Sequence, residues 1–201
     1  MAEAAIPDVP CGHCGAQTAR PLFEKHGYRL VRCTKCNLAY IANPPGEAEL
    51  AHVYSNDAGY HDQLLDPASA AHAEMTAVAR RHLAVLRREA TAGTLLDVGA
   101  SVGLFVAAAQ AAGFNARGVE FNAASAGYAR ETLGLDVSAG TLDKVDIARD
   151  SLDIVTMFDV IEHLRDPLEA MQQVRALLRP GGLFLLSTPD IDGWFPRLSY
   201  L

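Results

Sequence analysis

Short apolar runs alternate with longer amphipathic stretches over the second half of the chain. The short runs predict β-strands at residues 94–98, 116–120, 136–139, 152–158 and 183–188. The stretches between them predict helices at residues 104–112, at 122–133, and from Asp166-Pro167 to the Arg179-Pro180-Gly181-Gly182 turn. Strands that alternate with helices are typical of a parallel sheet with helices on both faces. The fold class that we expect is therefore α/β, with a doubly wound and mostly parallel sheet.

A further helix is expected before the first of these strands. Its start is predicted at Asp66-Pro67, because Asp caps helices well and Pro is tolerated in the first turn. Beyond Met75 the apolar side carries Val78, Ala79, His82, Val85 and Leu86, and the other side carries Arg80, Arg81, Arg87 and Arg88. We interpret this stretch as an amphipathic helix leading into the core strand, with the arginines as a solvated face rather than an anion site.

All four cysteines lie near the N-terminus as two C-x-x-C pairs, Cys11 with Cys14 and Cys33 with Cys36. This spacing is typical of a four-thiolate zinc site, in which each pair places two sulfurs on one side of a tight turn. Strands at residues 28–32 and 38–41 would bring the two turns together. A closed site of this kind has no open coordination position, so the zinc is expected to be structural. The alternative is a pair of disulfides or unused thiols.

The chain is expected to divide into three parts. Residues 1–43 form the zinc-ribbon module, residues 44–66 a linker or lid, and residues 67–201 the α/β domain. The break follows from the run Asn43-Pro44-Pro45-Gly46, which ends regular structure. The lid carries Tyr54, Tyr60 and His61, for which we favour a role in pinning the segment to the domain over a role in binding a ligand.

The strand at residues 94–98 leads into a glycine turn. Residues 95–105 read Leu-Leu-Asp-Val-Gly-Ala-Ser-Val-Gly-Leu-Phe, which is a strand, a tight turn and the start of a helix. Gly99 and Gly103 let the backbone turn sharply and a ligand approach it, and the helix start offers free N–H groups. The spacing does not match the dinucleotide pattern G-x-G-x-x-G. We expect a small polar ligand at this turn.

Polar residues also end the neighbouring strands, and ligands of open α/β sheets bind beyond the carboxyl ends of strands. Asp97, Glu120 and Asp159 lie at such ends, as does the run Ser187-Thr188-Pro189-Asp190. Glu120 follows Gly99 by 21 residues, close to the spacing at which an acid meets ribose hydroxyls in nucleotide-binding folds. The alternative role for Glu120 is that of a cap on the next helix.

The glycine turn also spells G-x-S-x-G, the nucleophile elbow of α/β-hydrolases. In that interpretation Ser101 is the nucleophile, and Asp159 and His163 complete a triad. We disfavour it because the elbow of that fold lies late in the sheet, whereas this turn begins the domain, and because Glu120 is left without a role. A third interpretation is a non-catalytic protein that binds a cofactor and interacts through its ribbon.

Five stretches resemble, in order and spacing, the motifs of the class I S-adenosylmethionine (SAM)-dependent methyltransferases: residues 95–99, 118–120, 158–164, 178–182 and 187–189. The resemblance covers roughly residues 94–190. It is greatest to the branch that includes ubiquinone-biosynthesis O-methyltransferases and small-molecule and sugar methyltransferases. It implies a Rossmann-like sheet, SAM as the cofactor, and methyl transfer to a small-molecule acceptor at oxygen or carbon.

The resemblance also implies roles for individual residues. Asp97, Gly99 and Gly103 would surround the methionine part of the cofactor, Ser101 of the same turn would also bind the cofactor, and Glu120 would bind the ribose. Phe121 and Leu142 would flank the adenine, and Phe158 and Asp159 would line the reactive end. His163, one helical turn beyond Asp159, would face the acceptor as a general base, for which an imidazole with a pKa of about 6.5 is suited. The alternative for His163 is a hydrogen bond to nearby backbone.

Charge and hydropathy limit the choice of partner. The 24 acidic residues exceed the 17 Lys and Arg residues, and the formal net charge is −7, which argues against nucleic acid or an anionic membrane as the partner. No apolar run is long enough for a membrane span, and the first residues lack the pattern of a signal peptide. We therefore expect a cytoplasmic location.

The end of the sheet carries one more expectation. The class usually has seven strands, whereas this sequence ends soon after the fifth, at residues 183–188. The fifth strand would then be an apolar edge strand, which is a liability for aggregation or strand pairing. We expect the chain to be truncated, or this edge to be covered by a partner or a second copy of the chain.

Overall fold

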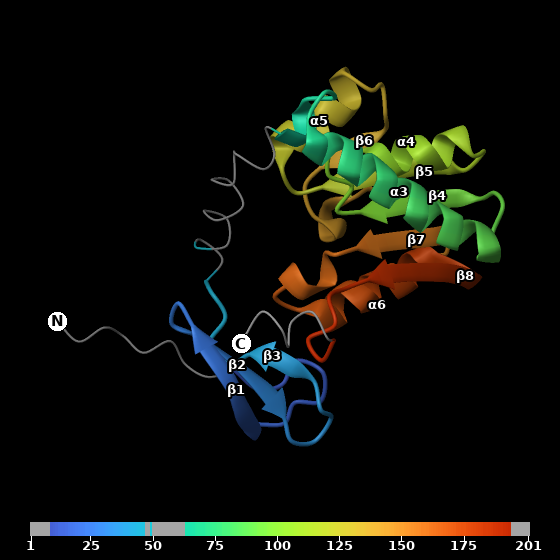
Figure 1. Cartoon of the computed structure of the whole chain (residues 1–201). Coiled ribbons are helices and arrows are strands. Elements are labelled where there is room, and N and C mark those ends of the chain that lie inside the picture. Colours follow the sequence, from blue (N-terminus) through green and yellow to red (C-terminus); the bar gives the residue numbers. More distant parts are fainter. Residues whose placement is uncertain (1–8, 47–48, 50–62, 194–201) are drawn as a thin grey trace.

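The computed structural model describes residues 9–46, 49 and 63–193. These residues form a small antiparallel sheet, in the order β1-β2-β3, and a larger sheet in the order β6-β5-β4-β7-β8 (Figure 1). Every pair of neighbouring strands in the larger sheet is parallel. The α/β class and the mostly parallel sheet are therefore confirmed.

The small sheet consists of β1 (Ala19–Lys25), β2 (Tyr28–Cys33) and β3 (Ala39–Ile41). A two-residue turn joins β1 to β2, and both of its residues, His26 and Gly27, have left-handed backbone angles, with φ of 50° and 80°. β2 and β3 match the expected strands, whereas the hydrophobic pattern does not predict β1. Pro21 interrupts its alternation and shifts its register, so pairing with β2 is what makes this segment a strand.

The larger sheet consists of β4 (Thr94–Val98), β5 (Asn115–Glu120), β6 (Val137–Ala139), β7 (Leu152–Phe158) and β8 (Leu178–Ser187). The first four agree with the expected strands to within a residue. The start of β8 at residue 183 was wrong, because Leu178 already pairs with Leu152. The register then shifts before Leu183 pairs with Ile154, so the Pro180-Gly181-Gly182 turn bulges out within the strand.

Among the described residues, four α-helices flank the larger sheet: α3 (Ala70–Glu89), α4 (Leu104–Ala111), α5 (Ala123–Glu131) and α6 (Pro167–Leu177). α6 begins where expected, with Asp166 as its cap and Pro167 in its first turn. The expected start of α3 was wrong by three residues. Ser69 caps this helix by accepting a hydrogen bond from the His72 N–H, and Asp66 instead accepts the Ala68 N–H in the preceding turn.

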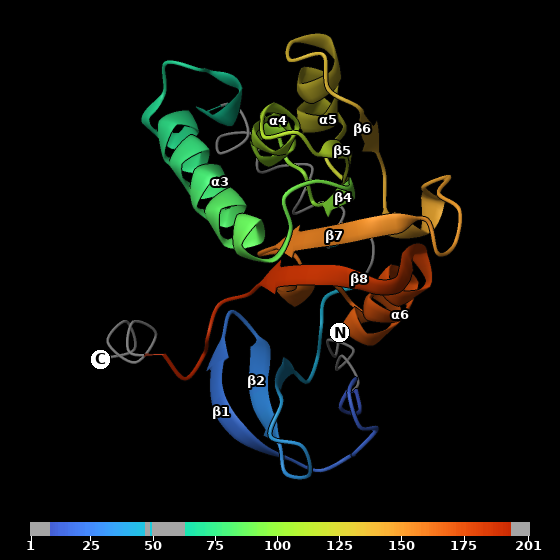
Figure 2. The same cartoon turned by 90° about the vertical axis from the view of Figure 1, so that its right-hand side faces the viewer.

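Two hydrophobic clusters lie on the two faces of the larger sheet. Leu95 and Ile154 belong to the cluster under α3, α4 and α5, whereas Leu96 and Val155 belong to the cluster that contains Val174 of α6. Figure 2 shows α3 and α4 on one side of β7 and β8, and α6 on the other. Both faces are therefore covered, as a doubly wound sheet requires.

β8 is an edge strand of the described sheet, and Leu186 near its end is 37% exposed. Within the described residues, no helix is long and apolar enough to cross a membrane. The lid residues Tyr54, Tyr60 and His61 lie outside the part of the chain that the structure describes.

Candidate functional site

The carboxyl ends of β4, β5, β7 and β8 lie side by side, and the candidate site is built on them. Val98 near the end of β4 is in register with Val119 on one side and Met157 on the other, and Phe158 is in register with Ser187. The glycine turn, Glu120 and Asp159 follow directly from these positions. The topology thus gathers the expected cofactor residues of four segments at one edge of the sheet (Figure 1).

Two positions of the glycine turn cannot hold a residue larger than glycine without strain. Gly99 and Gly103 have left-handed backbone angles, with φ of 78° and 84°. A Cβ on Gly99 would lie 2.3 Å from Val160 Cγ2, and one on Gly103 would lie 2.6 Å from Leu135 Cδ1. Gly103 caps α4 without a side-chain hydrogen bond, so the first turn of α4 keeps N–H groups for a ligand.

Glu120 is held by backbone donors from both sides. Its Oε2 accepts a hydrogen bond from the Ser101 N–H and its Oε1 accepts one from the Asn122 N–H, each at 2.7 Å. The residue is 9% exposed. Because each carboxylate oxygen accepts more than one hydrogen bond, this arrangement orients Glu120 toward the glycine turn and leaves lone pairs for a ligand's hydroxyl groups.

Asp97 is buried beside the turn, with 3% of its surface exposed. Its Oδ1 accepts a hydrogen bond from Thr156 Oγ1 at 2.6 Å, across the β4–β7 pairing. Burial raises the pKa of the carboxyl to about 7, assisted by the nearby Glu120 and opposed by the Thr156 hydrogen bond. Asp97 therefore carries a partial proton near neutral pH.

Phe158 ends β7 within a cluster of three rings. It stacks on the imidazole of His82 with ring centroids 3.8 Å apart, and it meets Phe105 edge-on at 4.9 Å. Burial and Arg81 lower the pKa of His82, although Asp159 acts in the opposite direction. The lowered pKa favours the neutral form of the His82 imidazole, which lies against the end of β7. The sequence placed His82 only in the apolar stripe of α3, a position that predicts packing against the sheet and not proximity to the site.

Asp159 lies beyond the end of β7 in a left-handed conformation, with φ of 54°. Its Oδ1 accepts a hydrogen bond from Ser187 Oγ at 3.0 Å, and its N–H donates to the Ser187 carbonyl at 3.0 Å. Thr188, which follows Ser187, makes a second hydrogen bond between the same two segments: its Oγ1 donates to Glu162 Oε2 at 3.2 Å. The segments that leave β7 and β8 are therefore joined through their side chains.

His163 does not lie one α-helical turn beyond Asp159, as was expected. His163 ends a single 3₁₀ turn, Ile161–His163, and its N–H donates to the Val160 carbonyl at 2.9 Å. Its side chain is exposed. Two residues were expected beside the adenine. Phe121 follows Glu120 and is 53% exposed, whereas Leu142 packs against the hydrophobic cluster that contains Val174 of α6.

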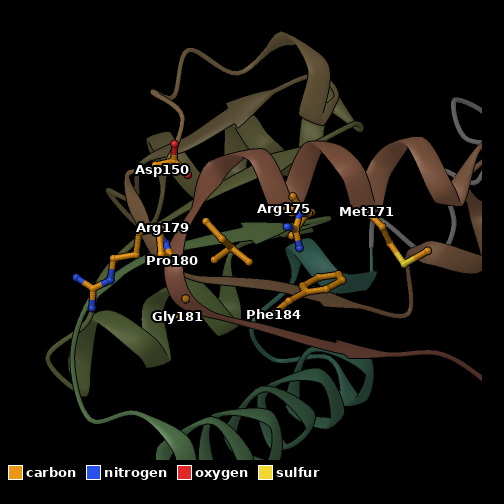
Figure 3. A pocket seen from close by; sticks show the side chains of 10 residues that line it. Asp150, Met171, Arg175, Arg179, Pro180, Gly181 and Phe184 are labelled. Carbon is orange, nitrogen blue, oxygen red and sulfur yellow. The ribbon is translucent and has the colours of Figure 1, made fainter.

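One of the five motifs lies at the opposite end of the sheet. Residues 178–182 line a cleft of about 530 Å³ between α6 and β8, which also includes Met171, Arg175 and Phe184 (Figure 3). Arg179 Nη1 pairs with Asp153 Oδ1 at 2.6 Å, and Asp153 Oδ2 accepts the Thr94 N–H at 2.7 Å. This motif braces the starts of β4, β7 and β8, at the end of the sheet opposite to the glycine turn.

The four cysteines form a compact cluster in the ribbon. All four sulfurs lie within 4.8 Å of one another, with Cys11 and Cys36 at 3.5 Å and Cys14 and Cys33 at 3.6 Å. Sulfurs that share a tetrahedral zinc ion at about 2.3 Å are about 3.8 Å apart, whereas disulfide sulfurs are about 2.05 Å apart. The four thiols are not joined by disulfides, and their spacing fits a zinc ion.

The thiols of the cluster differ in their readiness to ionise, because, against the effect of the Leu38 N–H, burial and the neighbouring thiols raise the pKa of Cys36 to about 12. The backbone N–H groups of Cys36 and Lys35 lower the pKa of the Cys33 thiol to about 6, against the effect of burial. A lowered pKa favours the thiolate, which is the form that binds a metal. Cys11 and Cys33 are almost fully buried, with 1% and 2% exposed, so a metal here would be shielded from water.

The fold and the glycine turn with its neighbouring acid define a class of protein, the class I SAM-dependent methyltransferases. A family model described as a methyltransferase domain matches residues 70–201. The chain belongs to this family. A SAM-dependent methyltransferase from Thermotoga maritima superposes with a TM-score of 0.52 at 19% identity, covering 76% of this chain and 64% of that one, which supports the fold.

Two relatives are similar in sequence to about half of this chain. The ubiquinone biosynthesis O-methyltransferase of Parvibaculum lavamentivorans is 32% identical over 122 residues, covering 51% of this chain and 48% of its own. A methyltransferase of Mycolicibacterium vanbaalenii, which is described as uncharacterized, is 40% identical over 105 residues, covering 49% and 40%. The chain thus spans about half the length of these relatives or less.

Proposed function

We propose that the protein transfers the methyl group of SAM to a small-molecule acceptor, at oxygen or carbon. The observation that carries the proposal is the position of Glu120, whose two oxygens accept N–H groups from the glycine turn and from the start of α5. A carboxylate that is oriented in this way accepts both hydroxyls of a ribose without rearrangement. The relationship to ubiquinone biosynthesis O-methyltransferases supports a small acceptor and transfer to oxygen.

In this proposal the residues of the chain bind and orient the cofactor. The backbone at Gly99, Ser101 and Gly103 holds the methionine part, with Asp97 behind it, and Phe121 and Leu142 lie beside the adenine. When bound, SAM supplies an electrophilic methyl group on a positively charged sulfur. The chain then needs to hold donor and acceptor in line, which contributes about 7–11 kcal/mol to lowering the barrier in well-oriented systems.

The acceptor would lie beyond the ends of β7 and β8. Phe158 and Asp159 border this region, and the exposed imidazole of His163 is proposed as the base that removes the acceptor's proton. The net charge of −7 supports a small molecule over nucleic acid, and we keep a cytoplasmic location as part of the proposal.

The second part of the proposal is a structural zinc ion in the ribbon, held by Cys11, Cys14, Cys33 and Cys36. Four thiolates leave no coordination position for a substrate, so the ion would stabilise the ribbon and take no part in methyl transfer.

The test is calorimetric titration of the full chain with SAM and with S-adenosylhomocysteine. Glu120→Gln should weaken both affinities by about 10- to 100-fold, because hydrogen bonds to a charged group are lost. Glu131→Gln, at an exposed position of α5, is the matched control and should leave them unchanged. Wild-type protein that binds neither compound would refute the proposal. Saturable binding without transfer to any tested acceptor would favour the non-catalytic alternative, and ester hydrolysis lost in Ser101→Ala would favour the hydrolase.

A further inference from the structure

A buried arginine of the ribbon contacts the segment that follows β8. Arg32 lies on β2, directly before the zinc-site residue Cys33, and is 7% exposed. Its Nη2 donates to Asp192 Oδ1 at 2.6 Å, a contact between residues 160 positions apart in the chain. Figure 2 shows the segment after β8 running toward the ribbon. A guanidinium that is removed from water requires such a counter-charge.

The other branch of the same guanidinium binds the cysteine turn. Arg32 Nη1 donates to the Asn37 carbonyl at 3.3 Å. Asn37 has a left-handed φ of 66°, and its N–H donates to the Cys33 carbonyl at 3.1 Å, which closes the turn that carries Cys33 and Cys36. Because the guanidinium is planar and rigid, the position of this carbonyl limits where the branch to Asp192 can point.

The Asp192 end of the contact leads toward the proposed acceptor side. The Asp192 N–H donates to Asp190 Oδ1 at 2.9 Å, which forms a local turn. Two residues before Asp190, Thr188 Oγ1 donates to Glu162, next to His163. These contacts, joined by the short stretch of chain between Thr188 and Asp190, therefore extend from the cysteine turn to the residues that border the proposed acceptor position.

We infer that Arg32 is a positioning residue that couples metal binding in the ribbon to the order of residues 188–193. A metal ion held by the four sulfurs keeps the Cys33–Cys36 turn and its Asn37 carbonyl in place, and this placement keeps Arg32 on Asp192. Loss of the metal releases the segment on the acceptor side of the site. The inference rests on the proposed function for the metal and for the acceptor position. It gives the ribbon a role in the larger domain.

The test is hydrogen–deuterium exchange of the full chain, with zinc content measured in parallel. Removal of zinc by a chelator should speed exchange at residues 188–193 by about tenfold, because a hydrogen bond between charged groups is lost. Arg32→Gln should produce the same increase with zinc still bound, and the chelator should add nothing further at these residues. Arg20→Gln is the matched control, because Arg20 faces Arg32 across the β1–β2 pairing and is exposed.

A second variant leaves the ribbon sequence intact. Asp192→Asn should speed exchange at residues 33–38 and the release of zinc to a chelator, because coupling acts in both directions. If Arg32→Gln fails to fold or loses zinc, this variant decides the question, and no change in either readout overturns the inference. Zinc-loaded protein whose residues 188–193 do not respond to the chelator overturns the coupling alone. Wild-type protein that binds no zinc overturns both the coupling and the metal assignment.

Discussion

The Cβ position of Gly99 lies 2.3 Å from Val160 Cγ2, so the chain after β4 and the chain after β7 meet at a point where a side chain on residue 99 cannot fit. Gly99 also has a φ of 78°. Two separate penalties therefore keep this position a glycine, one from the clash and one from the backbone conformation.

Gly99→Ala should lower the free energy of unfolding by about 2–4 kcal/mol, the sum of both penalties. Gly113→Ala measures the conformational part alone, because Gly113 has a φ of 96° and no atom lies within 4 Å of its Cβ position. It should cost about 1–2 kcal/mol. A double-mutant cycle of Gly99→Ala with Val160→Ala, measured by urea denaturation, should show a favourable coupling. Additive effects of the two changes would contradict the clash.

Asp97 should give the stability of the protein a distinctive pH dependence. Burial raises the pKa of its carboxyl from 3.8 to about 7, so the folded state holds a proton that the unfolded chain releases above pH 4. Its contribution to stability is complete below about pH 4 and is lost as the pH rises through about 7. The free energy of unfolding, measured by urea denaturation, should fall over this window in the wild type relative to Asp97→Asn.

The control for this prediction is Asp153→Asn. The Thr94 N–H and the Arg179 guanidinium hold the pKa of Asp153 below its usual range, so its stabilisation is present above about pH 4 and is lost as the pH falls further. The two variants should thus change opposite ends of the pH profile. An Asp97→Asn profile parallel to that of the wild type would show that Asp97 is ionised throughout.

The stacking of His82 on Phe158 should contribute to stability through ring contact and not through charge. His82→Ala should lower the free energy of unfolding by about 1 kcal/mol, whereas His82→Phe keeps an aromatic pair and should remain close to the wild type. Val85→Ala, at a position of α3 that is 43% exposed, is the control and should change little. Thermal denaturation at pH 7.5 measures all three, and equal losses for the two His82 variants would contradict the ring contact.

Metal content should follow the cysteines and not the nearby histidine. The wild type should bind one zinc ion per chain, and Cys33→Ser should abolish binding and unfold the ribbon, because a structural zinc site contributes directly to folding. His13→Ala should bind zinc as the wild type does, since His13 is exposed and four thiolates are enough to fill a tetrahedral zinc site. Atomic emission on dialysed protein measures the stoichiometry. Loss of zinc in His13→Ala would show that His13 is a ligand in place of one of the four cysteines.

Most of the larger sheet was predictable from the sequence, because its strands are short apolar runs separated by clear turn signals. Thr94–Val98 and Leu152–Phe158 were predicted to the residue for this reason. The starts of α3 and β8 were not, because each depends on competing local contacts. Ser69 displaces Asp66 as the helix cap, and pairing with β7 extends β8 across a Pro-Gly-Gly bulge.

Residue types and spacing alone indicated the glycine turn, the acid at the end of β5 and the paired cysteines, because each of these signals is local in the chain. The contacts between segments came from packing. Ser101 donates to Glu120 because β4 and β5 are adjacent, His82 reaches Phe158 because α3 lies across the sheet, and Arg32 meets Asp192 across 160 residues. A hydrophobic pattern records which face of an element is buried and not which distant element covers it, so these three relationships appear only in the folded chain.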